Sequence, residues 1–243
     1  IHGLHNDKIS SASEPCSTDE HPTVFRMIRE AMPDAVLGSY SNWNPINIGI
    51  IEDGLGVHKD TAGTDKELTQ KILTYLQQEA PTFLFVQFDD VDAVGHSNGY
   101  GTQAQLEKIS EIDTYVSEIY NAYSNLDVLD DTLFIVTADH GGSGKNHGGL
   151  TDGEKYVMFA AAGESVAEGE IEDMEIRDTA AVVLHALGYN IPDTWSDRDA
   201  RAVIGIRYEL DLRLGVTNLP TYVFLEDAQS KELAAILELN IPG

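Results

Sequence analysis

Cysteine is almost absent from this 243-residue chain. Its one cysteine, Cys16, cannot form an internal disulfide, and no zinc cluster built on cysteine is possible. Any metal ion must therefore be held by histidine and carboxylate side chains. Long apolar runs are absent too, because no stretch approaches the roughly 20 apolar residues that cross a bilayer. The sequence predicts neither a disulfide scaffold nor a membrane span.

Basic residues are scarce. Fifteen Lys and Arg stand against 41 Asp and Glu, which gives a formal net charge of −26. Such a chain has no basic surface for phosphate backbones, so we expect no binding of nucleic acid by charge. An acidic excess attracts cations and repels itself, which suggests a salty or calcium-bearing medium, with an ordinary acidic surface as the alternative. We expect a secreted or periplasmic protein, leave a cytoplasmic location open, and predict no oligomeric state.

Strand and helix patterns alternate along the chain, which predicts a layered α/β fold. Apolar runs predict buried strands at 82–88, 132–138 and 156–162, and a further strand at 35–40. We expect helices at 23–32 and 178–187, the second ending at Gly188. From residue 209 the pattern weakens, and we assign 209–243 to a C-terminal extension with a strand at 221–225 and a helix at 228–239.

Two further helices are predicted from apolar residues at helical spacing. The shorter is marked by Leu68, Ile72, Leu73 and Leu76. The longer is expected to bury one stripe of side chains: Leu106, Ile109, Ile112, Val116 and Ile119.

Polar, glycine-rich segments follow two of the predicted buried strands. They are DDVDAVGHSNGYG at 89–101 and DHGGSGKNHGG at 139–149. Ligands of open α/β sheets bind beyond the carboxyl ends of strands, and glycine lets the backbone turn tightly around an ion. Asp92 and His96 are four residues apart and so meet on one side of a helical turn. Carboxylate and imidazole suit a divalent cation, and the two segments supply five such side chains: Asp92, His96, Asp139, His140 and His147.

Together, FDDVDAVGH and TADHGGSGKNHGG resemble the alkaline phosphatase superfamily, and more closely its type I phosphodiesterase/nucleotide pyrophosphatase branch. The later DTAAVVLHALG and IPDTW also match, and the resemblance spans roughly residues 1–201. It implies a three-layer αβα sandwich with a mostly parallel central sheet, forming one catalytic domain over 1–243. It also implies two divalent ions, expected to be zinc. Asp92, His96 and His147 resemble the ligands of one ion, while Asp139 and His140 resemble two ligands of the other.

The resemblance implies an enzyme that hydrolyses small phosphate esters with two metal ions and a covalent phospho-enzyme. Phosphodiesters or nucleotide pyrophosphates are the favoured substrates, and a sulfatase or phosphomonoesterase of the same superfamily stays an alternative. A metal-independent enzyme like phosphoglycerate mutase is disfavoured, because no domain-sized insertion separates the two ligand segments.

The family's nucleophile, a Thr or Ser, and one metal-binding Asp precede an HG pair, which here is His2-Gly3. We therefore expect an N-terminally incomplete chain with no catalytic nucleophile of its own, which binds metal but is inactive alone. The rival is a non-catalytic truncated paralogue that binds metal or a partner.

INIGIIEDG at 46–54 could imitate the family's first strand, with Asp53 as ligand and Thr61 or Thr64 as nucleophile. We do not adopt that assignment, because Asp53 follows the HG pair. Several other ionisable side chains are expected to support the site or to be solvated or packed without binding metal: Asp89, Asp90, His5, His21, His58 and His185.

Overall fold

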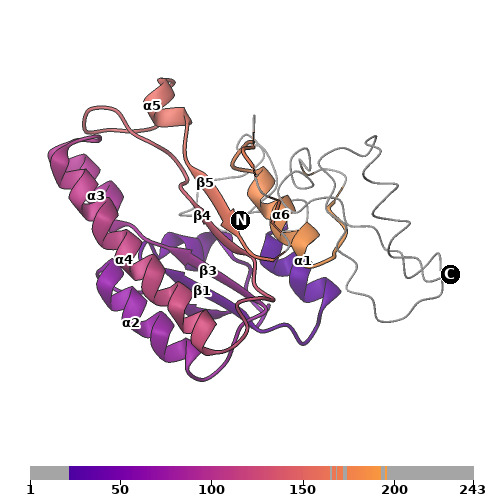
Figure 1. Ribbon diagram of the computed structural model, residues 1–243. Coiled ribbons are helices and arrows are strands. Elements are labelled where there is room, and N and C mark those ends of the chain that lie inside the picture. The colour runs from indigo at the N-terminus through magenta and orange to yellow at the C-terminus, as the bar shows by residue number, and fades with distance from the viewer. Residues whose placement is uncertain (1–21, 165, 168, 172–173, 193–194, 196–243) are drawn as a thin grey trace.

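The computed structural model describes residues 22–164, 166–167, 169–171, 174–192 and 195, which form the α/β structure that the sequence predicts (Figure 1). Its main sheet contains β1 (Leu37–Ser41), β2 (His58–Asp60) and β3 (Phe83–Gln87). The strands are parallel in the order β2-β1-β3, so Gly38 of β1 pairs with His58 on one side and Leu84 on the other. The carboxyl ends of β1 and β3 therefore lie at the same edge.

Helices cover both faces of this sheet (Figure 1). On one face, α1 (Val24–Ala31) and α6 (Asp178–Ala186) enclose a core that includes Phe25 and Leu184. On the other, α2 (Asp65–Leu76) and α4 (Gln103–Asn125) enclose a core of six buried residues: Tyr40, Leu68, Ile72, Leu76, Ile119 and Tyr123.

Strand β3 contributes to both cores by the alternation of its side chains. Phe83 and Phe85 pack toward α1, with the Phe25 and Phe83 ring centroids 5.0 Å apart, whereas Leu84 and Val86 pack toward α2. The strand is apolar throughout because each face meets a helix layer. Its side chains are half-buried rather than fully buried, since β3 ends the described order β2-β1-β3.

The predicted strands at 132–138 and 156–162 correspond to β4 (Phe134–Thr137) and β5 (Phe159–Ala162). They pair antiparallel with each other in a two-stranded sheet. Helix α6 covers the ribbon, with Val182 in a cluster that includes Ile135 and Phe159. The other face of β5 is exposed, and β4 is half-buried with Thr137 exposed, so full burial was wrong for both strands.

Capping residues set the helix ends near the predicted positions. The Thr23 hydroxyl accepts a hydrogen bond from the Arg26 amide at 3.4 Å and begins α1. Thr64 does the same for Glu67 at the start of α2. Helix α6 ends before Gly188, which has a φ of 77° that glycine adopts without strain.

The predicted buried stripe of α4 is wrong in its first turns. Leu106 and Ile109 are 53% and 45% exposed. Gln105 is buried instead, because its side-chain oxygen accepts a hydrogen bond from the Gly101 amide at 2.6 Å, which turns Leu106 outward. The predicted pattern resumes with Ile119, which is buried against α2.

Four elements have no counterpart among the predicted ones. They are β2, the helices α3 (Asp90–Asn98) and α5 (Asp152–Lys155), and the π-helix η2 (Ile46–Ile50). The apolar segment that could imitate a strand is thus a π-helix at its start. The predictions at 209–243, 221–225 and 228–239, like His5 and His21, fall outside the described residues. Where the structure is described, no helix is both long enough and apolar enough to cross a bilayer.

Candidate metal centre

Asp92 and His96 lie on α3, which begins just after β3. Their four-residue spacing places Asp92 Oδ2 3.3 Å from His96 Nε2, as the sequence predicts. His96 Nδ1 lies 2.8 Å from the carbonyl oxygen of Lys145, in the segment after β4. A carbonyl only accepts, so Nδ1 carries the hydrogen and Nε2 is left with the lone pair that can bind a metal.

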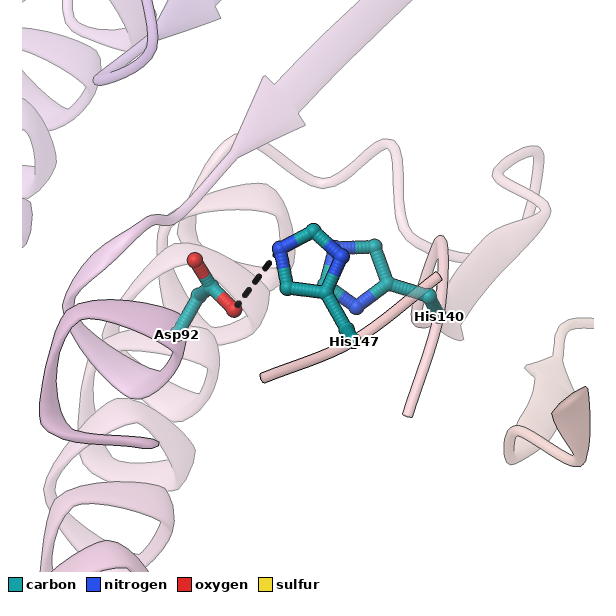
Figure 2. Close-up of side chains that lie close together, drawn as sticks. All are labelled: Asp92, His140 and His147. Atoms are coloured by element: carbon teal, nitrogen blue, oxygen red, sulfur yellow. Dashed lines mark ion pairs between the residues drawn. The ribbon is translucent and has the colours of Figure 1, made fainter. Parts of the chain in front are cut away.

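His140 and His147 come from the segment after β4 and face α3 (Figure 2). Their rings stack with centroids 3.8 Å apart and an interplanar angle of 17°. His147 Nε2 lies 4.0 Å from Asp92 Oδ1. One ligand atom from each of Asp92, His140 and His147 lies within 4.8 Å of the others. The two predicted segments therefore meet at one place.

Asp139 stands at the edge of this cluster. Its carboxylate lies 3.7 Å from His140 Nε2, and its side chain is 85% exposed. His140 Nδ1 lies 2.9 Å from the Gly141 carbonyl, which again leaves Nε2 as the possible ligand atom. Of the five predicted residues, three form the compact group, His96 borders it through Asp92, and Asp139 borders it through His140.

Tyr100 connects the two segments and was missed by the sequence analysis. Its hydroxyl donates a hydrogen bond to Asp92, and its ring packs against Gly95 of α3 and Gly142 of the segment after β4. Its amide donates to the Gly144 carbonyl at 2.8 Å. Burial raises the pKa of the Tyr100 phenol, and the hydrogen bond to Asp92 adds to that shift, so Tyr100 stays a donor. The glycines at 95 and 142 were the available signal.

Carboxylates crowd the carboxyl end of β3. Burial raises the pKa of Asp89, while a hydrogen bond from Gln87 lowers it, and the nearby charges of Asp92, Asp139 and Asp90 raise it again. The net shift is upward, as expected where several negative charges gather in a partly desolvated place. A divalent cation would relieve this repulsion.

Asp65 was also missed. It is fully buried at the start of α2, and its carboxylate accepts hydrogen bonds from the backbone amides of Asp89 and Asp90 at 2.9 and 2.8 Å. Burial raises its pKa, against the lowering effect of these hydrogen bonds and one from Asn42. The sequence gave no sign that Asp65, at the start of α2, turns toward α3.

The alternative assignments lie elsewhere in the fold. Asp53 is fully exposed, with its carboxylate 3.6 Å from Lys59 Nζ, and the Thr64 hydroxyl is used to cap α2. His58 stacks on Tyr75 with centroids 5.0 Å apart. His185 lies half-buried in α6.

The donor set fits a metal ion. Imidazole and carboxylate groups are the zinc ligands that a chain with one cysteine can offer, and the hydrogen bonds of His96 and His140 leave Nε2 of both rings as the possible ligand atom. Among the described residues, the histidine, cysteine and acidic side chains that lie close enough together to hold an ion are Asp92, His140 and His147. Phenol and backbone carbonyls around it orient the donors.

The fold and this cluster define an alkaline-phosphatase-like α/β protein with carboxylate and imidazole groups beyond its strand ends. Residues 21–226 match the family described as type I phosphodiesterase / nucleotide pyrophosphatase, so the chain belongs to that family. Phosphoglycerate mutase of Leishmania mexicana has a similar structure, with a TM-score of 0.51 and 14% identity over 67% of this chain and 36% of that one. This likeness shows the fold alone.

Two curated relatives are similar in sequence. GPI ethanolamine phosphate transferase 2 of Aspergillus fumigatus is 30% identical over 172 aligned residues, covering 59% of this chain and 22% of that protein. GPI ethanolamine phosphate transferase 3 of Schizosaccharomyces pombe is 35% identical over 92 residues, covering 37% of this chain and 9% of that protein. The chain thus spans less than a quarter of the length of either relative.

Proposed function

We propose that this chain carries the metal-binding part of an active site that cleaves phosphate esters, with phosphodiesters or nucleotide pyrophosphates as substrates. Asp92, His96 and His147 hold one zinc ion. Asp139 and His140 contribute to a second. Family membership supports the phosphodiesterase-type chemistry.

The convergence of ligands proposed for both ions carries this proposal: Asp92 and His147 of the first ion lie beside His140 of the second. The three side chains come from two segments that follow different strands, and their ligand atoms gather within 4.8 Å. Bound cations of this kind neutralise charge on phosphoryl oxygens and lower the pKa of an attacking oxygen. Exposed acids alone would repel the phosphate ester, so its binding depends on that neutralisation.

The chain's own residues keep the donors in place. The carbonyl oxygens of Lys145 and Gly141 accept from His96 and His140, which fixes both rings. The Tyr100 hydroxyl holds one oxygen of Asp92. Partners of this kind fix ligand orientation and raise metal affinity.

A second candidate is transfer of a phosphoethanolamine group, supported by the two curated relatives that are named for it. The metal-binding residues would be the same, and only the acceptor would differ, an alcohol in place of water. A sulfatase, a phosphomonoesterase and a non-catalytic metal-binding paralogue also share these side chains. The preference for one class of ester therefore distinguishes these candidate functions better than the metal-binding residues do.

The test measures binding of bis-p-nitrophenyl phosphate, p-nitrophenyl phosphate and p-nitrophenyl sulfate to the chain, each with zinc and after chelation. We expect the diester to bind most tightly and only with zinc, and Asp92→Ala to abolish that binding. His58→Ala is the matched control. His58 begins β2, stacks on Tyr75 of α2 and lies outside the cluster. Diester binding that survives chelation, or tighter binding of the sulfate ester, would overturn the proposal.

A further inference from the structure

The structure assigns to Asp65 the role of a positioning residue: from α2 it caps the N-terminus of α3 and so fixes the direction of Asp92. The inference rests on the proposed function, since it concerns the affinity of that metal centre. Asp65 does not touch Asp92, and it acts through the backbone that carries it.

The geometry of the cap is specific. Asp65 Oδ1 accepts hydrogen bonds from Asn42 Nδ2 at 2.7 Å and from the Asp89 amide at 2.9 Å, while Oδ2 accepts from the Asp90 amide at 2.8 Å. The Asp65 side chain is fully buried, so it reaches these donors without competition from water.

Helix α3 lacks a cap of its own. Asp89 stands at its N-cap position but makes no side-chain capping hydrogen bond. The first amides of a helix have no partner within the helix, and a negative charge there is favoured by the helix dipole. Asp65 supplies both a charge and acceptors from a different helix.

The contact is reciprocal. The Asp65 amide, at the first position of α2, donates to Asp90 Oδ2 at 3.4 Å. Asp90 is also 3.8 Å from Lys108 Nζ of α4. At each of the two helix starts, a backbone amide therefore donates to a carboxylate of the other helix. The ammonium group of Lys108 on α4 offsets part of the negative charge.

The same carboxylate also reaches the main sheet. Asn42, whose side chain donates to Asp65, follows β1. The backbone amide of Asn42 donates to the carbonyl oxygen of Gln87, at the end of β3, at 3.0 Å. Asp65 thus ties the first turn of α3 to the ends of both strands. Asp92 lies in that turn and His96 one turn later, so loosening the cap displaces both donors relative to His147.

The experiment titrates the metal-stripped full chain with zinc by calorimetry and follows hydrogen exchange in the peptide spanning 89–98. The variants are Asp65→Ala, Asp65→Asn and the control Asp178→Ala. Asp178 is also a fully buried acid at the first position of a helix, and its carboxylate accepts the Glu175 amide at 2.9 Å, but it belongs to α6. Both alanine variants lose stability, whereas only Asp65→Ala should change metal affinity.

We expect Asp65→Ala to weaken zinc binding about tenfold or more, the lower end of what supporting residues contribute, and to speed exchange at 89–98. Asp65→Asn should fall between the wild type and Asp65→Ala, because its amide keeps one acceptor oxygen; it also serves if Asp65→Ala does not fold. Unchanged zinc affinity and unchanged exchange in a folded Asp65 variant, or an equal loss of affinity in Asp178→Ala, would overturn the inference. A wild type that binds no zinc would instead contradict the proposed function, while the exchange data would still test the cap.

Discussion

The carboxylate of Asp92 and the imidazole of His147 lie 4.0 Å apart, although one belongs to α3 and the other to the segment after β4. This distance is too long for a hydrogen bond. Tetrahedral zinc with bonds of about 2 Å to oxygen and nitrogen places two ligand atoms of one ion about 3.3 Å apart. The pair is therefore slightly wider than the ligands of one ion, and small side-chain rotations would bring both atoms to that spacing.

Removing the Tyr100 hydroxyl should weaken metal binding. Tyr100→Phe keeps the ring between Gly95 and Gly142 but takes away the hydrogen bond to Asp92. We expect zinc affinity to fall about tenfold, measured by calorimetry. Tyr115→Phe is the matched control. It removes the hydrogen bond from the Tyr115 hydroxyl to the Glu111 carboxylate, at 2.5 Å, within α4 and away from Asp92. Equal affinities for Tyr100→Phe and wild type would show that the hydroxyl does not orient Asp92.

Gly95 should tolerate no side chain. A Cβ at this position would lie 2.7 Å from Tyr100 Cε1, so Gly95→Ala must displace the ring. Overpacking of this kind typically costs about 1 to 3 kcal/mol, and urea unfolding would measure it. At Gly153, the nearest atom to an added Cβ is the Gly142 carbonyl oxygen at 3.4 Å, so Gly153→Ala should be close to neutral. Similar unfolding midpoints for the two variants would contradict this account of the Tyr100 packing.

The ion pair of Asp60 and Lys71 predicts a pH dependence of stability. Burial alone would raise the pKa of Asp60, but hydrogen bonds from Lys71 Nζ and the Thr61 amide, both at 2.7 Å, lower it overall. A lowered folded-state pKa contributes stability above the ordinary value of 3.8, and this contribution is lost as pH falls through the folded pKa. Because both side chains are partly exposed, its size is at most about 1 kcal/mol.

Urea unfolding of wild type and Asp60→Asn between about pH 6 and about pH 2 tests this sign. The wild type should be the more stable at the upper end, and the difference should vanish at the lower end. Lys71→Met should reduce the same difference. A gap between wild type and Asp60→Asn that widens toward acid pH would mean that burial outweighs the hydrogen bonds.

The formal net charge of −26 predicts that salt stabilises the fold. Screening shortens the reach of charge repulsion from about 30 Å at 0.01 M salt to about 8 Å at 0.15 M. We expect Tm to rise over that range by about 2 to 4 °C for each kcal/mol gained, and KCl to act like NaCl. A flat or falling Tm would mean that the acids are already neutralised by bound cations.

Local patterns were enough to predict most of the elements that build the layers. The apolar run ending at Phe88 predicted β3, because both faces of that strand meet helices, and Thr23 and Gly188 marked the ends of α1 and α6. The chemistry-bearing side chains were found for a related reason. Ligands of α/β proteins bind beyond strand ends, and both ligand segments follow a strand, although β3 and β4 belong to different sheets.

The rest depended on hydrogen bonds that the spacing of apolar residues does not predict. In α4, Gln105 is buried and accepts a hydrogen bond from the Gly101 amide, while Leu106 is exposed. The spacing of apolar residues does not predict that hydrogen bond. Asp65 and Tyr100 escaped notice for the same reason, since each acts on a residue of another element. Sequence spacing predicts which residues share a helix face, but not which partner that face meets.

Zinc titration of the metal-stripped chain and two histidine variants tests the central claim most directly. We predict about one tightly held zinc per chain, because Asp92, His96 and His147 are three ligands, whereas Asp139 and His140 are only two. His147→Ala should abolish this tight binding, and His140→Ala should leave it nearly intact, with His58→Ala as the unaffected control. Absence of tight zinc binding by the wild-type chain, or its loss in His140→Ala with retention in His147→Ala, would contradict the account.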